Sequence, residues 1–123
     1  MNFVRGIRGA TTADSNTSNG IIEATRELLT SMVESNDVDI GDITAIFFTT
    51  TPDLQAEFPP LAARQLGWEY VALINSIEMD VPGAQQKCIR ILMLVNTEKS
   101  QKEIKFVYLK EAVSLRKRGV ENS

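Results

Sequence analysis

One charged side chain lies inside an apolar stretch of this chain. Arg90 is the only charge in 88–95, a run of branched aliphatic residues that follows a Pro-Gly turn and indicates a β-strand. Its guanidinium group cannot lose its proton, so it must reach water, a carboxylate or carbonyl partner, or an anionic ligand. Glu78, in the loop before the turn, is a candidate for that partner. Arg90 therefore belongs either to a structural ion pair or to an anion-binding cavity.

Three other residues with a charge or a hydroxyl group stand in apolar or motif-like surroundings: Arg8, Arg64 and Tyr108. The planar fork of arginine binds carboxylates through two parallel hydrogen bonds, so these groups together with Glu78 could bind a small polyanion that bears a hydroxyl. Each also has a plainer explanation, Arg64 as an exposed helix residue and Tyr108 as half-buried packing with a wet hydroxyl. That explanation is weakest for Arg90, because a buried ion pair is costly and often no better than apolar packing. The pattern is compatible with an anion-binding α/β domain, although spacing alone does not show that the side chains converge.

Two residue counts exclude several kinds of catalytic site. The chain has no histidine, which excludes Ser-His-Asp and Cys-His triads and zinc sites built on histidine. It has one cysteine, which excludes intrachain disulfides and CxxC redox or metal motifs. What remains is carboxylate-driven catalysis, magnesium-assisted chemistry, or catalysis by electrostatics and positioning.

Charge and hydropathy also argue against some classes of partner. A net charge of −3 at pH 7, no basic run before the tail and no interleaved aromatic residues argue against nucleic-acid binding. No apolar run approaches the roughly 18 residues of a transmembrane helix, and the N-terminus lacks the apolar region of a signal peptide. We therefore expect a cytoplasmic protein that binds neither nucleic acid nor a membrane.

The hydrophobic pattern predicts the elements that must position these residues. Strands are expected at 3–12, 43–51, 71–75, 88–95 and 105–109, with an amphipathic helix at 18–35, a short helix at 60–66 and one helical turn at 111–116. This order predicts an α/β (α+β) fold, in which a mixed sheet has helices packed on one face. The chain is expected to form a single domain, 1–116, followed by a mobile tail, 117–123. An apolar opposite face of such a sheet would suit oligomerisation.

Short segments along most of the chain have the same order and nearly the same spacing as the corresponding segments of one enzyme family. They are RGIRGATT (5–12), TPDL (51–54), FP (58–59), AAR (62–64), GW (67–68), EMDV (78–81) with Gly83, KCIR (87–90), VYL (107–109), AV (112–113) and LR (115–116). Each fragment alone is weak, whereas the ordered set is highly specific. In this set the chain resembles the monofunctional chorismate mutases of the Bacillus type.

The resemblance implies a homotrimer with a pseudo-barrel of sheets at its centre and active sites between adjacent subunits. It also implies the reaction, an intramolecular Claisen rearrangement of chorismate to prephenate in the biosynthesis of phenylalanine and tyrosine. A pericyclic rearrangement needs no nucleophile, proton transfer, metal or cofactor, which agrees with the absence of histidine. The enzyme has to hold a flexible dianion in its reactive conformation and stabilise the charge that develops as the ether bond breaks.

The resemblance also assigns roles to individual residues. Arg90 would donate to the ether oxygen and to a substrate carboxylate, and Glu78 would accept from the ring hydroxyl and face the positive charge that develops on the ring. Arg8 and Tyr108 would hold a carboxylate. The other substrate-binding residues that the resemblance implies are Phe58 as an apolar wall, Arg64 from the neighbouring subunit, Leu73, Ile74 and Asn75, and Leu115 and Arg116 in the C-terminal segment that closes over the site.

Two positions depart from the family pattern. Asn75 stands where the Bacillus-type enzyme has a cysteine near the substrate hydroxyl, and an amide can still donate or accept a hydrogen bond there. Leu61 replaces a lysine near the mouth of the cleft and so removes a charge that could steer a dianion. Two alternative functions stay open: a non-catalytic trimeric module that binds small anions, and a plain oligomerisation domain whose arginines form ion pairs.

Overall fold

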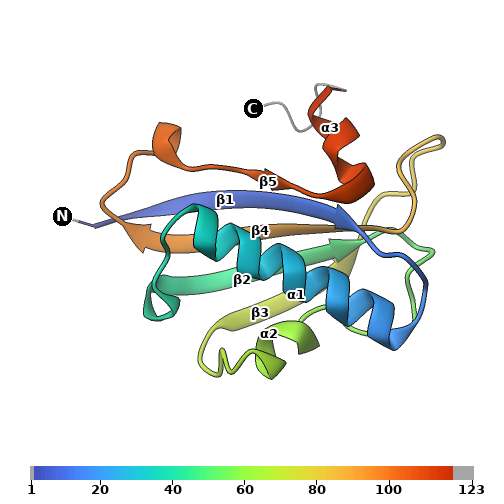
Figure 1. Cartoon of the computed structure of the whole chain (residues 1–123), viewed down its shortest axis with the longest axis horizontal. Coiled ribbons are helices and arrows are strands. Elements are labelled where there is room, and N and C mark those ends of the chain that lie inside the picture. Colours follow the sequence, from blue (N-terminus) through green and yellow to red (C-terminus); the bar gives the residue numbers. More distant parts are fainter. Residues whose placement is uncertain (1, 118–123) are drawn as a thin grey trace.

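The fold is a five-stranded sheet with helices against one of its faces (Figure 1). A computed structural model describes residues 2–117, and for 116 and 117 only the backbone is described. The elements follow the order β1 (Phe3–Thr12), α1 (Ser18–Ser35), η1 (Ile40–Asp42), β2 (Ile43–Thr50), α2 (Leu61–Gln65), β3 (Ala72–Ile77), β4 (Cys88–Thr97), η2 (Gln101–Glu103), β5 (Val107–Tyr108), η3 (Lys110–Val113) and α3 (Ser114–Lys117). Within 2–117, no helix is long and apolar enough to cross a membrane.

The sheet mixes parallel and antiparallel pairs. Its strand order is β3-β2-β4-β1-β5. The central strand β4 runs antiparallel to both β2 and β1, whereas β3 lies parallel to β2 and β5 lies parallel to β1. Helices α1 and α2 contact each other on the same side of the sheet. The predicted fold class, a mixed sheet with helices packed on one face, is therefore confirmed.

The core lies between α1 and the sheet. Helix α1 begins where the Thr17 side chain accepts from Gly20 N at 2.9 Å, and its apolar stripe is buried against Ile7, Ile46 and Met93. Gly9 lies directly under this helix, because a Cβ added there would be 2.5 Å from the Sδ of Met32. A residue without a side chain is thus what allows α1 to approach β1 closely.

Among the described residues, no long helix covers the opposite face of the sheet, although Ala112 and Leu115 pack on Ala10 and Cys88 at one end of it. Side chains alternate along each strand, so this face carries Val4, Phe47 and Leu92, which are 57%, 41% and 38% exposed. The same face carries Arg8 and Arg90. We call it the open face below, and its predicted role in oligomerisation stays a prediction.

Element bounds agree closely with the sequence prediction at the N-terminal half of the chain. Strand β1 and helix α1 span the predicted residues, 3–12 and 18–35. The strands predicted at 43–51, 71–75 and 88–95 and the helix at 60–66 differ from the observed elements by one or two residues at one or both ends, which is the usual spread for fraying ends. The single turn predicted at 111–116 is instead a 3₁₀ turn, η3, followed by a short helix, α3.

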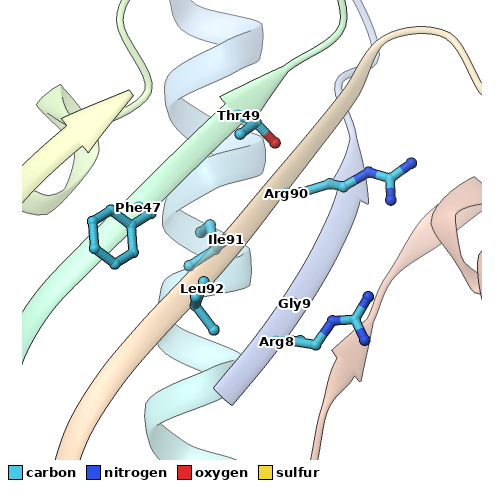
Figure 2. Close-up of a pocket in the computed structure, with 7 residues that line it drawn as sticks. All are labelled: Arg8, Gly9, Phe47, Thr49, Arg90, Ile91 and Leu92. Carbon is cyan, nitrogen blue, oxygen red and sulfur yellow. The ribbon is translucent and has the colours of Figure 1, made fainter. Parts of the chain in front are cut away.

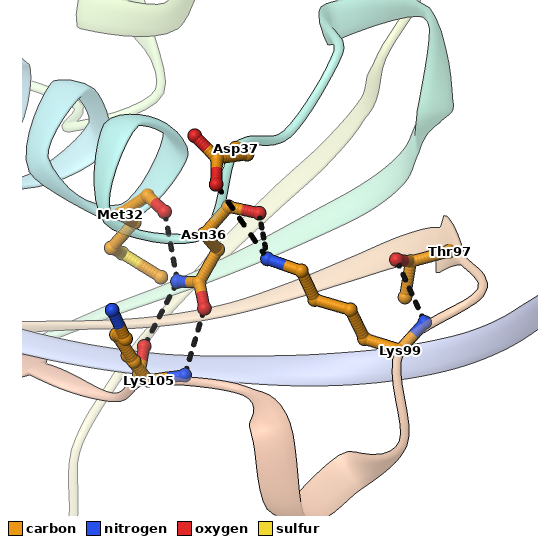
Figure 3. A network of polar contacts seen from close by, with 6 residues as sticks. All are labelled: Met32, Asn36, Asp37, Thr97, Lys99 and Lys105. Atoms are coloured by element: carbon orange, nitrogen blue, oxygen red, sulfur yellow. Dashed lines mark hydrogen bonds and ion pairs between the residues drawn. The ribbon is translucent and has the colours of Figure 1, made fainter.

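The strand predicted at 105–109 is shorter at both ends in the structure, where β5 holds only Val107 and Tyr108. The backbone of Lys105 is bonded instead to a side chain from another element: Lys105 N donates to Asn36 Oδ1 at 2.7 Å, and Asn36 Nδ2 donates to Lys105 O at 2.9 Å (Figure 3). Asn36 follows the end of α1 and also donates to Met32 O at 3.0 Å. Of the predicted tail 117–123, residues 118–123 lie outside the described part of the chain.

Candidate functional site

Arg90 lies in the middle of a row of residues that crosses the open face. Its cross-strand neighbours are Thr49 on β2 and Ala10 on β1, and Ala10 in turn pairs with Tyr108 on β5. Residues that pair across strands share a face of the sheet, so the four side chains lie on one line. Ala10 lies between Arg90 and Tyr108 in this row and is buried in a cluster with Ala112 and Leu115.

Arg8 stands two residues before Ala10 and therefore on the same face. Figure 2 shows that the guanidinium groups of Arg8 and Arg90 both point away from their strands toward the side of the sheet where β5 lies. The Cζ of Arg8 lies 5.7 Å from the centre of the Phe106 ring, which places a cation over an aromatic face. Both arginines are half-buried.

A cavity of about 350 Å³ opens between these arginines, and we call it the arginine cavity. It is lined by Arg8, Gly9, Phe47, Thr49, Arg90, Ile91 and Leu92 (Figure 2). Its walls are mostly apolar, and its charges are both positive. Guanidinium groups next to apolar walls are less screened than on an open surface, so the cavity suits a small molecule with more than one negative charge.

Glu78 supplies the carboxylate of the site. It follows the last residue of β3, and its backbone N donates to Thr50 O at 2.9 Å, which continues the pairing of β3 with β2 by one step. Its Oε2 lies 3.1 Å from Arg90 Nε, and the exposed fractions of the two side chains are 14% and 27%. The structural ion pair that the sequence left open is thus present in this chain.

The remaining predicted residues fall into a second group, away from the arginine cavity. Phe58, which is 68% exposed, and Asn75 line a separate depression of about 290 Å³ together with residues of the loop that follows β2. Arg64 on α2 uses its Nη1 to donate to Trp68 O at 2.6 Å and to Glu69 O at 3.1 Å. In a single chain, these three side chains therefore do not line the cavity that Arg8 and Arg90 form.

Four predicted residues have other surroundings. Leu73 is half-buried and packs against the core, while Ile74 is 60% exposed and pairs with Phe47 of the open face. Leu115 is 2% exposed and packs with Ala10 in a small cluster against which Tyr108 lies. The side chain of Arg116 lies outside the described part of the chain.

Glu57, in the loop that carries Phe58, has a structural role. Glu57 accepts from Phe58 N at 3.0 Å and from Ser18 Oγ at 2.8 Å, and these two bonds, the first being the larger cause, lower the pKa of Glu57 from its ordinary value of 4.5. The ionised carboxylate therefore ties the Phe58 loop to the first turn of α1. Among residues 2–117, no group of three or more acidic, cysteine or histidine side chains could hold a metal ion.

The sequence did not point to Thr49, Phe47 or Leu92 as residues of the site. Thr49 is one of three consecutive threonines, and nothing in their order distinguishes the one that faces the cavity from Thr50 and Thr51, which are buried. The register of β2 against β4 decides it, because that register pairs Thr49 with Arg90. A prediction of the register between these two strands would have been needed to find this residue.

Comparison with known proteins gives consistent results over nearly the whole chain. The sequence profile of a family described as chorismate mutase type I matches residues 4–118. Two curated proteins named chorismate mutase AroH, from Bacillus subtilis (strain 168) and Thermus thermophilus, are 44% and 46% identical over 115 residues, which covers 93% of this chain and 91% and 94% of theirs. A solved chorismate mutase structure from Clostridium thermocellum matches with a TM-score of 0.86 and 50% identity over 88% of this chain and 96% of that one.

Proposed function

This chain belongs to the chorismate mutase type I family, and we propose that the arginine cavity is the place where it converts chorismate into prephenate. The enzyme is an isomerase of aromatic amino-acid biosynthesis, and its reaction is an intramolecular Claisen rearrangement. The observation that carries the location is the convergence of Arg8 and Arg90 on one apolar-walled cavity, with the Glu78 carboxylate in contact with Arg90.

The arrangement supports a division of roles along the substrate. Chorismate is a dianion, and Arg8 together with Tyr108 would hold one of its carboxylates. Arg90 would donate to the ether oxygen, where negative charge grows as the bond breaks. Because the substrate already carries all the bonds that rearrange, the cavity has only to select the compact conformer and stabilise this charge. A preorganised donor of this kind lowers a barrier by about 2.7–4 kcal/mol in other enzymes.

The ion pair between Glu78 and Arg90 is compatible with these roles. Glu78 contacts Nε, the nitrogen nearest to the arginine stem, at 3.1 Å. A guanidinium group carries five donors in a rigid fork, so Arg90 can pair with Glu78 on its Nε side and donate to the substrate from its terminal nitrogens. Glu78 would then face the ring of the substrate, where its charge stabilises the positive charge that develops.

The second group of residues supports an assembly of several chains. Phe58 is 68% exposed although it is a large aromatic residue, and the open face exposes Phe47 and Leu92 as well. Single chains rarely leave such residues uncovered over an extended area, whereas oligomer interfaces bury them. We infer a homotrimer in which Phe58 and Arg64 of one subunit complete the arginine cavity of the next, with active sites at the subunit interfaces.

The proposal includes roles for the residues at the edges of this cleft. Leu73, Ile74 and Asn75 would line it from β3, and Leu115 and Arg116 would close it from the C-terminal side. Asn75 would serve the substrate hydroxyl through its amide. We also infer that the enzyme acts in the cytoplasm and requires neither a metal nor an organic cofactor.

The test is an activity measurement on the purified chain. We expect the absorbance of chorismate to fall on addition of protein in the presence of EDTA and without any cofactor, with prephenate as the product by NMR. A rate equal to that of chorismate alone would overturn the proposal. If chorismate binds, as measured by calorimetry, but is not consumed faster, the chain is the anion-binding module that the sequence also allowed.

A further inference from the structure

We propose that Thr49 is a positioning residue that holds the Glu78 carboxylate in place for the reaction. This inference rests on the proposed function, in which Glu78 faces the ring of the substrate. The Oγ1 of Thr49 donates to Oε2 of Glu78 at 2.7 Å, and the bond is partly buried. Hydroxyl-to-carboxylate bonds of this length are charge-assisted and stronger than bonds between neutral groups.

One hydrogen bond and one ion pair, from different strands, meet at the same oxygen of Glu78. Thr49 Oγ1 on β2 and Arg90 Nε on β4 both contact Oε2, at 2.7 and 3.1 Å. The described residues place no polar partner on the other oxygen, Oε1. The carboxylate is thus held by the protein through one oxygen, which leaves the second one for a ligand.

The location of Glu78 explains why it needs such a support. It stands one position after the end of β3, and the next residue, Met79, is 85% exposed. A glutamate side chain has several rotatable bonds, and fixing them costs conformational entropy. Thr49 is different, because it lies inside β2 and its β-branched side chain has few allowed rotamers. The rigid residue therefore positions the flexible one.

The hydroxyl of Thr49 also keeps its role when the substrate is present. Figure 2 shows that it points toward β4, on the side where Arg90 lies. The positive charge of Arg90 is shared between Glu78 and the incoming dianion once the substrate binds. The bond from Thr49 carries no charge that the substrate can attract, so it holds Oε2 throughout the reaction.

The test compares two substitutions that differ by one functional group. Thr49→Val keeps the branched shape and removes the donor, whereas Thr49→Ser keeps the donor. We expect Thr49→Val to lower kcat by on the order of tenfold to a hundredfold, the range that a hydrogen bond to a charged group represents, with a change in KM of less than about threefold. The kcat of Thr49→Ser should stay within about threefold of that of the unchanged enzyme, because serine keeps the donor.

A matched control comes from the same strand. Thr44 on β2 also makes a side-chain hydrogen bond, from Oγ1 to Leu94 O at 3.2 Å, but it does not line the arginine cavity. Thr44→Val should leave kcat unchanged. If Thr49→Val does not fold, as judged by its thermal unfolding, Thr49→Ala takes its place, because it introduces no second methyl group.

A double-mutant cycle separates positioning from a general structural role. In an enzyme that already carries Glu78→Ala, Thr49→Val should have no further effect on kcat, because the group that it positions is gone. Independent, multiplicative losses of kcat would overturn the inference, and so would a Thr49→Ser variant as slow as Thr49→Val. These results presuppose an active unchanged enzyme, whose inactivity would overturn the proposed function itself.

Discussion

Arg90 Nε lies 3.1 Å from Glu78 Oε2, so the two groups at the centre of the site form an ion pair without any ligand. Both side chains keep some exposure, which limits what the pair adds to stability. Its effect on the site is larger, since the pair neutralises part of the charge of the guanidinium group. Arg8 then carries more of the initial attraction for a dianion.

Arg90→Gln should therefore damage the reaction far more than the fold. We expect kcat to fall by about two to three orders of magnitude, as when one preorganised donor is removed from other active sites. The temperature of unfolding should change little, because glutamine is also polar and can still donate a hydrogen bond to Glu78. Both quantities are measured on the same preparation, with the chorismate assay and with circular dichroism.

Arg5→Gln is the matched control for this substitution. Arg5 lies on β1 as Arg8 does, but its Nε donates to Lys99 O at 2.9 Å and it does not line the arginine cavity. The activity of the Arg5→Gln variant should stay within about threefold of that of the unchanged enzyme, the spread typical of surface substitutions. A modest loss for Arg90→Gln would mean that conformational restriction alone accounts for catalysis.

Mixing two inactive variants tests whether a cavity uses residues of two subunits. Arg64→Ala and Arg90→Ala should each be nearly inactive as pure assemblies. If the chain forms the proposed trimer, mixing gives some interfaces that combine the intact Arg64 of one subunit with the intact Arg90 of the next, so part of the activity should return. Native mass spectrometry confirms the mixing. Mixed trimers without activity would place Arg64 outside the shared site.

How far sequence alone predicts this fold depends on where each hydrogen bond goes. The bounds of α1 were predicted because its cap and its apolar stripe are local, with Thr17 bonded to Gly20 three residues later. The bounds of β5 were not, because the Asn36 side chain bonds the backbone of Lys105 from 69 residues away. A local sequence pattern cannot predict which distant side chain will form hydrogen bonds with a given backbone group.

The same distinction applies to the site. The context of Arg90 in an apolar strand and the family resemblance were enough to select Arg8 and Arg90, and both line one cavity. Thr49 required the register between β2 and β4. The resemblance assigned Arg64 to the cavity of the neighbouring subunit, and its distance from this chain's own cavity is consistent with that expectation. Its hydrogen bonds to the Trp68 and Glu69 carbonyls were not predicted.

Gly9→Ala tests the close approach of α1 to the sheet. The added Cβ would lie 2.5 Å from Met32 Sδ and 3.1 Å from Leu28 Cδ1, and both side chains are fully buried. We expect a loss of about 1–3 kcal/mol in the free energy of unfolding, the usual cost of overpacking. Gly6→Ala is the control on the same strand, because its nearest neighbour would be Leu92 Cδ1 at 3.4 Å.

A double variant shows whether the clash with Met32 causes the loss. In a Met32→Ala background the space above β1 is larger, so Gly9→Ala should cost less than it does alone. Urea unfolding of the four proteins provides the comparison. Equal costs in both backgrounds would assign the effect to the backbone conformation of residue 9 instead.

Asn36→Ala should loosen the C-terminal segment of the chain from the helix layer. The substitution removes three side-chain hydrogen bonds, to Met32 O, Lys105 O and Lys105 N (Figure 3). At about 0.5–1.5 kcal/mol each, the free energy of unfolding should fall by about 1.5–4.5 kcal/mol. Asn19→Ala, at an exposed position of the same helix, should change it by less than about 0.5 kcal/mol.

The position of Lys105 links this stability effect to the site. Lys105 precedes β5, which carries Tyr108 at the end of the row that contains Arg90. When Asn36 no longer holds Lys105, Tyr108 should spend less time in the geometry that binds a carboxylate, and KM for chorismate should rise while kcat changes less. Hydrogen exchange at Val107 and Tyr108 should become faster in Asn36→Ala but not in Asn19→Ala. Unchanged exchange at these two amides would show that pairing with β1 alone holds β5 in place.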